Sequence, residues 1–417
     1  MKDNKVTQAY EIAKERYAQL GVDVEKVLTT LEQIPLSIHC WQTDDVSGFE
    51  NPDGQLTGGI QTTGNYPGKA RNIDEVRQDL EEALSHIPGN HRLSLHAIYG
   101  DFGGKFVDRN EIEPKHFESW MQWAKENNMK LDFNSTSFSH PKSGELSLSN
   151  PDDSIREFWI EHTKRSREIA NAMGEYQNDP CIMNLWIHDG MKDETVNRLK
   201  YRQLLKESLD EIYKTPYKHM VDCLESKLFG IGAESYTVGS HDFYLAYGVK
   251  NDKVVTLDIG HFNTAENVAD KISSLLLFTK EIMLHVTRPV RWDSDHVVTI
   301  NDSTLDLMKE ITRADALNKV HIGLDFFDAS INRIGAYVVG SRSTQKCLLQ
   351  ALLEPIERLR KYEANGQYFE RLALLEEAKT MPWGAVWDMF CLRNDVAIGD
   401  SFISEVQKYE KNVSLKR

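Results

Sequence analysis

The chain of 417 residues lacks several features that would assign it to a whole class of protein. It has no run of eighteen apolar residues, so no membrane-spanning helix is expected. Its first segment, MKDNKVTQAYEIAKERYAQL, is charged and helix-like, without the apolar core or cleavage site of a secretory signal. Basic residues are in the minority, 49 Lys and Arg against 64 Asp and Glu, and a net charge of −15 argues against a nucleic-acid partner.

Cysteine is scarce, and its spacing suggests no pairing. Five cysteines stand far apart, no two of them at metal-ligand spacing, and an odd number makes a poor disulfide framework. Cys40, Cys181 and Cys223 lie in or beside apolar runs, where a reduced, buried thiol is the ordinary interpretation. We therefore expect a cytoplasmic protein with neither nucleic acid nor membrane as a partner.

What the sequence does contain is a regular series of short apolar, β-branched runs bounded by polar turns. Amphipathic stretches such as IDEVRQDLEEALSHI and IREFWIEHTKRSREIANAM separate most of them. Eight such units indicate an α/β protein with a (β/α)8 TIM barrel, and the lack of a GxGxxG turn after the first strand disfavours a doubly wound open sheet. The runs are PLSIHCW (from Pro35), RLSLHA (Arg92), LDFNST (Leu131), IMNLWIH (Ile182), DCLESKLF (Asp222), VVTLDIGH (Val254), MLHVTRPV (Met283) and HIGLDFFD (His321).

Segments at both ends fall outside this repeat. Residues 1–34 are expected to form an N-terminal helical segment, and residues 35–343 the catalytic barrel. Residues 344–417 predict a closing helix, TQKCLLQALLEPIERLRKY, followed by a C-terminal helical extension. Apolar positions of the extension need burial against either a neighbouring subunit or the chain's own barrel, and the two arrangements look alike in sequence. These positions are Phe369, Leu372, Leu374 and Leu375.

A long connection rich in Gly, Asn and Thr, residues 44–74, follows the first expected strand. Loops of this length inside a compact domain usually serve as a lid or a binding loop. On length alone, an ordinary surface excursion is an equally good interpretation.

The carboxyl ends of the expected strands carry polar residues, and this is where barrels of this type place their active sites. One charged residue there could form a structural ion pair, but many carboxylates and imidazoles together would be costly to bury unpaired. Glu225 and Lys227 are two apart in an extended segment, as are Asp293 and Asp295, so each pair should point one way. The strand-end candidates are His39, Trp41, His96, Asn134, Trp186, His188, Glu225, Lys227, Asp258, His261, His285, Asp293, Asp295 and Asp325.

This set of side chains is typical of a metal site. Adjacent carboxylates repel each other, and a bound cation relieves the repulsion. Several carboxylates with imidazoles and no thiolate suit manganese, magnesium or cobalt better than structural zinc, and they suffice for two ions. Plainer interpretations exist for single residues: His39 as a core histidine, Lys227 as a mere partner of Glu225, and Trp41 and Trp186 as core aromatics instead of an apolar wall for a sugar.

Longer segments resemble the L-rhamnose isomerase family, which is related in fold and site layout to xylose isomerase. The resemblance covers essentially the whole chain and is carried by HCWQTDDV, DCLESKLFGIGAESYTVGSHDFY, TLDIGHFN, MLHVTRPVRWDSDHVV and HIGLDFFDASINRIGAYVVG. It implies a cytoplasmic homotetramer that interconverts L-rhamnose and L-rhamnulose. It also implies two manganese ions per subunit, with Co2+ or Mg2+ as the alternatives.

The resemblance further implies a role for each matching residue. A first, structural ion would be bound by Glu225, Asp258, His285 and Asp325. A second, catalytic ion would be bound by His261, Asp293 and Asp295, with Asp258 bridging the two. Lys227 would contact the substrate oxygen beside the reacting carbons and completes the catalytic set with His261, Asp293 and Asp295. The other sugar-contacting residues would be His96, Trp186, Trp41 and Phe133.

The implied reaction moves a carbonyl from C1 to C2, with the ions as Lewis acids and hydrogen crossing as a hydride. A cis-enediol route with a carboxylate base is the alternative, and another aldose is the alternative substrate. A metal-dependent phosphodiesterase of the same fold is disfavoured, since no Lys/Arg cluster surrounds the strand ends. A sugar-binding protein with a dead site is disfavoured because no expected ligand position is lost.

Overall fold

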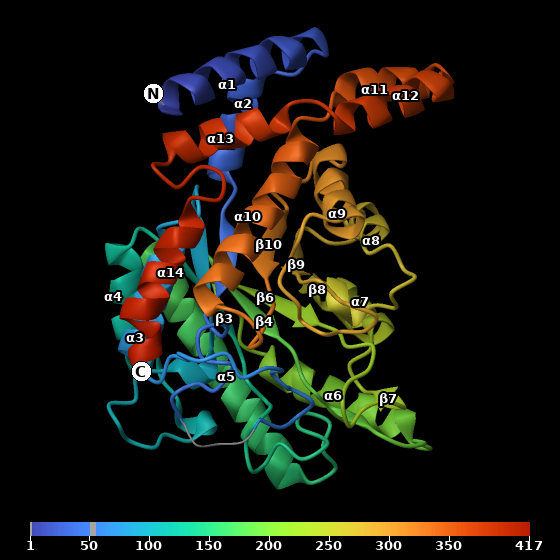
Figure 1. Cartoon of the computed structure of the whole chain (residues 1–417). Helices are drawn as coiled ribbons and strands as arrows, with labels where there is room; N and C mark the ends of the chain where they lie inside the picture. The colour runs from blue at the N-terminus through green and yellow to red at the C-terminus, as the bar shows by residue number, and fades with distance from the viewer. Residues whose placement is uncertain (1, 51–55) are drawn as a thin grey trace.

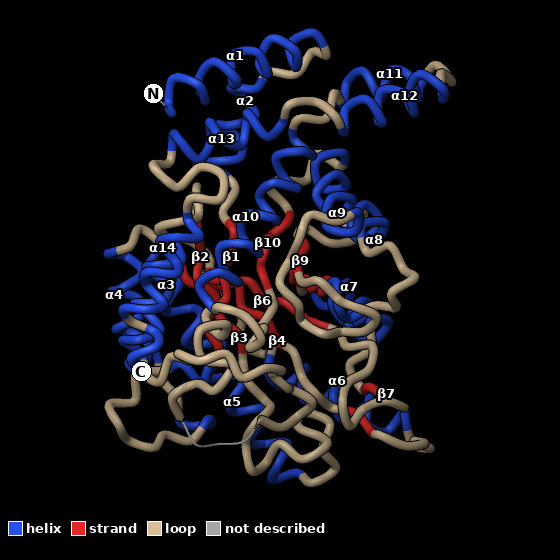
Figure 2. Tube along the Cα trace, viewed as in Figure 1, coloured by secondary structure: helices blue, strands red, loops and turns tan. Residues whose placement is uncertain are grey.

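The computed structural model of the protein describes residues 2–50 and 56–417. Its centre is a closed parallel barrel in the order β1-β10-β9-β8-β6-β4-β3-β2, surrounded by helices (Figures 1 and 2). Each predicted strand coincides with or overlaps one barrel strand, so the predicted (β/α)8 fold is confirmed. The strands are β1 Leu36–His39, β2 His91–His96, β3 Lys130–Asn134, β4 Cys181–Leu185, β6 Met220–Glu225, β8 Val254–Asp258, β9 Ile282–Val286 and β10 Val320–Leu324.

The barrel strands are apolar because both of their faces are covered. Side chains fill the inside of such a barrel, and helices pack on its outside. Every residue of β4, β8 and β9 is buried. The outer helices are α3 Ile73–Leu84, α4 Glu118–Glu126, α5 Asp153–Gln177, α6 Arg198–Ile212, α7 His241–Asn251, α8 Ala269–Leu275, α9 Asp302–Arg313 and α10 Arg333–Leu352.

Further helices precede and follow the barrel. Figure 1 shows α1, α2 and α13 as a layer beyond the amino ends of the strands, with α11 and α12 beside it, while α14 runs back along α3. None of the helices in the described part of the chain has the length and apolar character needed to cross a membrane. Their bounds are α1 Lys2–Gln19, α2 Val24–Gln33, α11 Ile356–Ala364, α12 Tyr368–Lys379, α13 Trp383–Arg393 and α14 Phe402–Asn412. Short elements complete the chain: β5 Gly190–Met191 paired with β7 Tyr236–Thr237, and η1 Ala97–Tyr99, η2 Arg109–Glu111, η3 Pro114–Phe117, η4 Ile259–His261 and η5 Ser414–Lys416.

The helix that closes the barrel differs from the prediction. It begins at Arg333, so the expected boundary between residues 343 and 344 falls inside α10. Glycine disfavours a helix in sequence, but Gly340 is needed here because a Cβ would lie 2.5 Å from the ring of Phe326. Pro355 then divides the expected helix, and α11 begins at Ile356, because proline has no N–H to continue the helical ladder.

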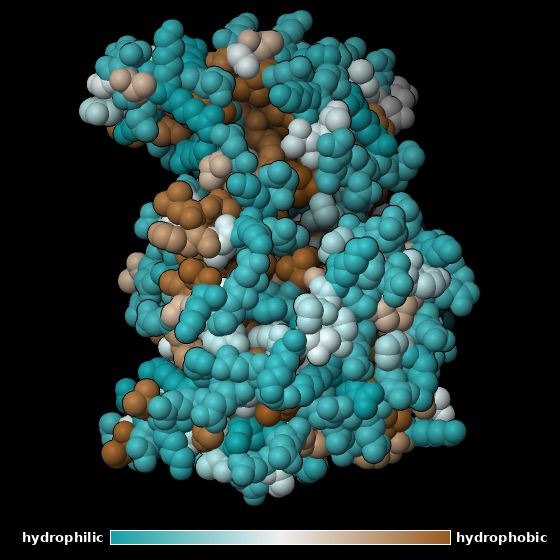
Figure 3. Space-filling model, turned by 180° about the vertical axis from the view of Figure 1, so that it is seen from behind, coloured by the Kyte–Doolittle hydropathy of each residue, from teal (hydrophilic) through white to brown (hydrophobic). Residues whose placement is uncertain are grey.

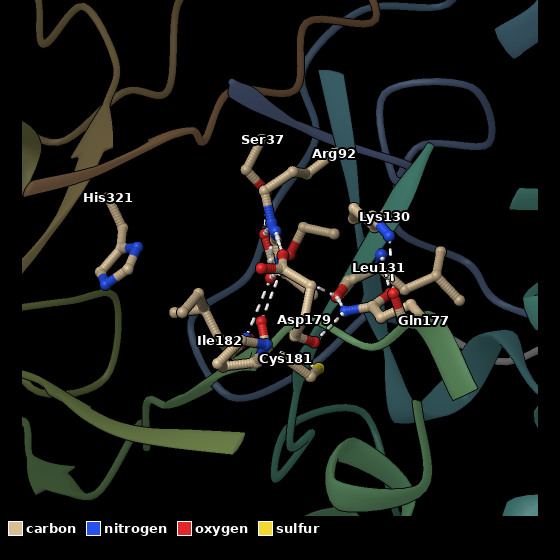
Figure 4. A network of polar contacts seen from close by, with 12 residues as sticks. Ser37, Arg92, Lys130, Leu131, Gln177, Asp179, Cys181, Ile182 and His321 are labelled. Carbon is tan, nitrogen blue, oxygen red and sulfur yellow. Dashed lines mark hydrogen bonds and ion pairs between the residues drawn. The ribbon is translucent and has the colours of Figure 1, made fainter. Parts of the chain in front are cut away.

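A network of polar side chains joins the strands at the amino end of the barrel (Figure 4). Arg92 on β2 pairs with Asp132 on β3 at 2.8 Å and also with Asp179. Asp132 accepts hydrogen bonds from Ser37 Oγ on β1 at 2.7 Å and from the Ile182 N–H on β4 at 2.9 Å. The network lines a cavity of about 460 Å³. Since its members satisfy one another and join four neighbouring strands, it stabilises the barrel at the end away from the strand-end candidates.

Candidate active site

A second cavity lies at the carboxyl ends of the strands. Glu225 ends β6, Asp258 ends β8, His285 belongs to β9, and Asp325 directly follows β10. The register places Asp258 beside His285 on the neighbouring strand. The cavity is lined by Trp41, Val46, Ile60, His96, Asn134, Phe138, Asn184, Trp186, Glu225, Lys227, His261, His285, Asp295, Asp325 and Phe327.

Four of the predicted metal ligands form one group. One ligand atom each from Glu225, Asp258, His285 and Asp325 lie within 4.8 Å of one another. His285 Nδ1 is 3.2 Å from Glu225, 3.5 Å from Asp325 and 3.8 Å from Asp258. Yet His285 Nδ1 and Asp258 Oδ2 are buried without a hydrogen-bond partner among the described residues. Buried polar atoms normally find partners, so atoms that converge without bonding one another fit a cation held between them.

Asp258, His261 and Asp293 form a second group of ligand atoms, which shares Asp258 with the first. The short helix η4 turns the chain immediately after β8, and Asp258 Oδ1 accepts the Gly260 N–H at 2.6 Å at its start. A Cβ at Gly260 would collide with Asp293 Oδ1, so glycine allows the Asp293 carboxylate to approach. His261 Nδ1 and Asp293 Oδ1 are again buried without a hydrogen-bond partner in the described part of the chain.

Lys227 brings a fixed positive charge to this cavity. Its ammonium donates to Asp293 and lies 3.0 Å from His261 Nε2 and 5.3 Å from the ring centre of Trp186. Burial alone would lower the pKa of Lys227, but Asp293 and Asp295 raise that pKa above its ordinary value. A permanently charged donor in a buried site is suited to stabilise negative charge on a substrate oxygen.

The carboxylates of the cavity compete for few positive charges. Burial, with Glu225 and Asp293 nearby, raises the pKa of Asp258 to about 8 despite His261. Burial and the Asp293 charge likewise raise the pKa of Asp295 well above its ordinary value. Burial would raise the pKa of Asp293 too, but Lys227 and His261 hold it below its usual range. Some members of the set are therefore protonated when no cation compensates them.

Neighbouring side chains orient two of the ligands. Asn184 donates to Glu225, and Thr256 Oγ1 donates to Asn184 Oδ1 at 2.8 Å, which fixes the orientation of the amide. Trp41 Nε1 donates to Asp325 Oδ1 at 3.0 Å, so Trp41 both lines the cavity and holds a ligand. Sequence reasoning missed Asn184, although its spacing of two from Trp186 was a usable signal for a shared strand face.

The rest of the lining is aromatic and apolar. Val46 and Ile60 belong to the 44–74 connection, so this loop contributes to the site and is more than a surface excursion; its residues 51–55 lie outside the described residues. Burial lowers the pKa of His96 to about 3, which keeps its imidazole neutral, and its Nδ1 lies 2.9 Å from Thr136 Oγ1. Trp186 Nε1 is buried with no hydrogen-bond partner among the described residues and offers a free donor.

Three other candidate side chains differ in their surroundings. Phe133 is fully buried and packs edge-on against Phe117 at 5.1 Å, while Asn134 lines the cavity, because successive strand residues face opposite sides. Asp295 lines the cavity but does not join the second ligand group. Asp293 and Asp295 would point the same way in an extended segment, whereas the φ of Asp295 is 45°. His39 packs against Phe326 in the core, as its plainer interpretation held.

The fold defines the class: an α/β barrel whose carboxylate-rich cavity lies at the carboxyl ends of the strands, where barrels of this class place their active sites. The model of the L-rhamnose isomerase family matches residues 4–417. The chain belongs to the L-rhamnose isomerase family and is thus an aldose–ketose isomerase.

Named relatives agree with this assignment. The L-rhamnose isomerase of Bacteroides thetaiotaomicron is 67% identical over 416 residues, which cover 100% of both chains. The L-rhamnose isomerase of Escherichia coli O9:H4 is 55% identical over 413 residues, 98% of each chain. Among solved structures, a D-allulose 3-epimerase from Methylomonas sp. aligns with 78% of this chain and 98% of its own, at 10% identity and a TM-score of 0.46. The assignment rests on the sequence relatives.

Proposed function

We infer that this protein catalyses the reversible isomerisation of L-rhamnose to L-rhamnulose. The observation that carries this inference is the pair of ligand groups that share Asp258 beside Lys227, in a chain of the L-rhamnose isomerase family. The reaction moves a carbonyl between C1 and C2, so charge develops on two adjacent oxygens. Two neighbouring cation positions and one fixed ammonium group suit that requirement.

We propose that each subunit uses two divalent ions, with manganese preferred and cobalt or magnesium as substitutes. Glu225, Asp258, His285 and Asp325 would hold the first ion. His261 and Asp293 would hold the second with the shared Asp258, and Asp295 would complete that set from the cavity wall. Carboxylates with two imidazoles and no thiolate support this choice of metal. Bound there, the ions would supply Lewis acidity to the sugar oxygens.

The chain's own residues bind and orient the sugar in this proposal. Lys227 steadies the negative charge that develops on O1, since its ammonium is already fixed in the cavity. Trp186 presents an indole N–H, and His96 a neutral imidazole, to the sugar hydroxyls. Hydrogen passes from C2 to C1 as a hydride, so no carboxylate needs to accept a carbon-bound proton.

An apolar wall matches the one apolar end of L-rhamnose, which is a 6-deoxy sugar with a methyl group at C6. Val46, Ile60 and Phe327 line the same cavity as the ligand groups. A methyl group gains free energy in such surroundings, whereas a hydroxyl there would lose its hydrogen bonds to water. We propose that these side chains receive C6.

We also propose a cytoplasmic homotetramer assembled partly through the helical extension. Phe369 and Leu372 on α12 are 79% and 60% exposed, and Leu277 and Phe278 after α8 are 80% and 70% exposed. Seen from behind, hydrophobic surface gathers in the hollow between the helical layer and the barrel (Figure 3). Exposed apolar surface of this extent favours subunit contacts. All five cysteines are free and buried, which supports a reducing compartment.

The test is ketose formation from L-rhamnose by protein stripped with a chelator and assayed with and without Mn2+. Turnover that requires the metal would support the inference. No turnover by folded protein with any divalent ion would contradict it, and other aldoses and then a phosphodiester would be assayed next. Asp295→Asn should abolish turnover while leaving the circular dichroism spectrum unchanged; wild-type activity in that variant would refute its proposed role.

A further inference from the structure

One stretch of backbone contributes to the cavity from outside the barrel strands, and we name residues 56–68 the site loop. It brings Ile60 into the cavity lining. Its first part is bonded to the loop after β3, where the Thr57 N–H donates to Ser139 Oγ at 3.0 Å. Its later part lies directly on the loop after β10: Tyr66 N–H donates to Ala329 O at 2.8 Å, and a Cβ at Gly64 would collide with that same carbonyl. The position of Ile60 therefore depends on how firmly both flanks are held.

The Tyr66 flank is bound by two helices of the carboxyl-terminal part of the chain. Tyr66 Oη donates to Glu410 Oε1 on α14, and Asn332 Nδ2, at the start of α10, donates to the same oxygen at 2.8 Å. Arg333 donates to the Tyr66 carbonyl at 2.9 Å and pairs with Asp45 at 2.8 Å. A single carboxylate thus joins the site loop to α10 and α14.

The contact continues along the end of α14. A Cβ at Gly68 would lie 2.7 Å from the Cβ of Ser414, so the loop backbone packs closely on η5. Arg417 donates to the Gly68 carbonyl at 3.2 Å and to Asp79 at 2.7 Å. None of the residues from α14 onward lines the cavity. This helix therefore reaches the cavity indirectly, through the site loop and through the loop after β10 that carries Phe327 and ends at Asn332.

We propose that α14 acts as a latch that holds Ile60 against C6 of the sugar, and that Tyr66 and Glu410 are positioning residues that favour 6-deoxy over 6-hydroxy aldoses. The proposal rests on the proposed function. Discrimination against a hydroxyl requires a wall that water cannot enter, because the penalty arises from lost hydration. An apolar pocket rejects an added hydroxyl by a factor on the order of 100 when it is closed. A loosened site loop would admit water to C6 and reduce that factor.

The direct test is Tyr66→Phe, which removes the hydroxyl that reaches Glu410 and keeps the ring. The Mn2+-loaded enzyme is assayed with L-rhamnose and with L-mannose, its 6-hydroxy counterpart. We expect the KM for L-rhamnose to rise several-fold with a smaller change in kcat. The ratio of kcat/KM for L-rhamnose over L-mannose should fall about 3- to 10-fold, while the Mn2+ affinity stays unchanged.

The matched control is Tyr10→Phe, which removes the same group from a hydroxyl bonded to Glu25 at 2.8 Å in the helical layer. It should leave the ratio unchanged. Glu410→Ala should reproduce Tyr66→Phe, and Glu410→Gln, which keeps an acceptor for Tyr66, should recover most of the discrimination.

Two results would overturn the proposal. One is an unchanged ratio in folded Tyr66→Phe and Glu410→Ala, which would make the contact merely structural. The other is an equal loss of kcat/KM for both sugars, which would mean that the loop binds them uniformly. Failure of the proposed function is distinguishable, since wild-type protein would then not turn over L-rhamnose at all.

Discussion

Asp258→Asn is the most informative single substitution, because Asp258 belongs to both ligand groups. The change preserves shape. Asn retains the oxygen that accepts the Gly260 N–H at 2.6 Å, so η4 should keep its turn and His261 its place. What is lost is one negative charge at the point where the two cation positions meet. We therefore expect weaker binding of both ions from one isosteric change.

The magnitude follows from linkage between binding and unfolding. An ion at a free concentration 100-fold above its Kd stabilises the folded state by about 2.7 kcal/mol, so two ions give roughly 5 kcal/mol. In the ion-free protein the substitution should have the opposite effect on stability. Burial and the neighbouring carboxylates raise the pKa of Asp258 to about 8, which means that its charge is unfavourable there. Without ions, Asp258→Asn should be as stable as wild type or more stable; with ions it should be less stable.

Bound manganese per chain after dialysis, and melting temperature with Mn2+ or with chelator, measure both halves of this prediction. Wild type should bind two ions, Asp258→Asn fewer than one, and the control Asp325→Asn, in the first group alone, should keep one. Two ions bound by Asp258→Asn with a wild-type rise in melting temperature would refute the shared-ligand reasoning. Lower stability of the variant in chelator would instead indicate general damage to the fold.

Three further outcomes are expected. Arg92→Met leaves Asp132 buried without its cation, which should cost about 3–5 kcal/mol of stability in chemical unfolding and leave kcat unchanged; a loss below about 1 kcal/mol would mean that the pair is dispensable. Isomerisation in deuterated water should place little deuterium at C1 of recovered aldose, and substantial incorporation would favour the enediol route. Burial raises the pKa of Asp44 to about 7, so the folded state binds a proton that the unfolded state releases, and stability from this group falls as pH rises toward 7. Between pH 5 and 7, the free energy of unfolding of Asp44→Asn should fall by roughly 2 kcal/mol less than that of wild type. An equal fall in both proteins would contradict this.

The strands were predictable because each is a short apolar, β-branched run bounded by polar turns. Glu225, Asp258 and His285 could be assigned to one site because parallel strands bring their carboxyl ends together. Phe133 was expected in the site only from the family resemblance. The alternation in β3, KLDFN, puts Asn134 on the face of Asp132 and Phe133 on the opposite face with Leu131, and this pattern agrees with the structure.

Features that depend on distant partners could not be predicted. Gly340 disfavours a helix locally, and only the ring of Phe326, on another segment, explains its presence in α10. The backbone at Asp295 has a local φ of 45° that the Asp-x-Asp spacing does not encode. The contact of Tyr66 with Glu410 joins positions 344 apart in sequence.

The two ends of a barrel strand carry residues with different roles. β2 carries Arg92 near its start, in the network of Figure 4, and ends with His96 in the cavity. Likewise, β3 carries Asp132 in the network and Asn134 in the cavity. Each strand therefore works as a spacer of fixed length. One inserted or deleted residue would misplace one end and turn the following side chains to the opposite face. Length variation in this protein should be confined to the loops and the outer helices, and these strands should tolerate substitution far better than insertion.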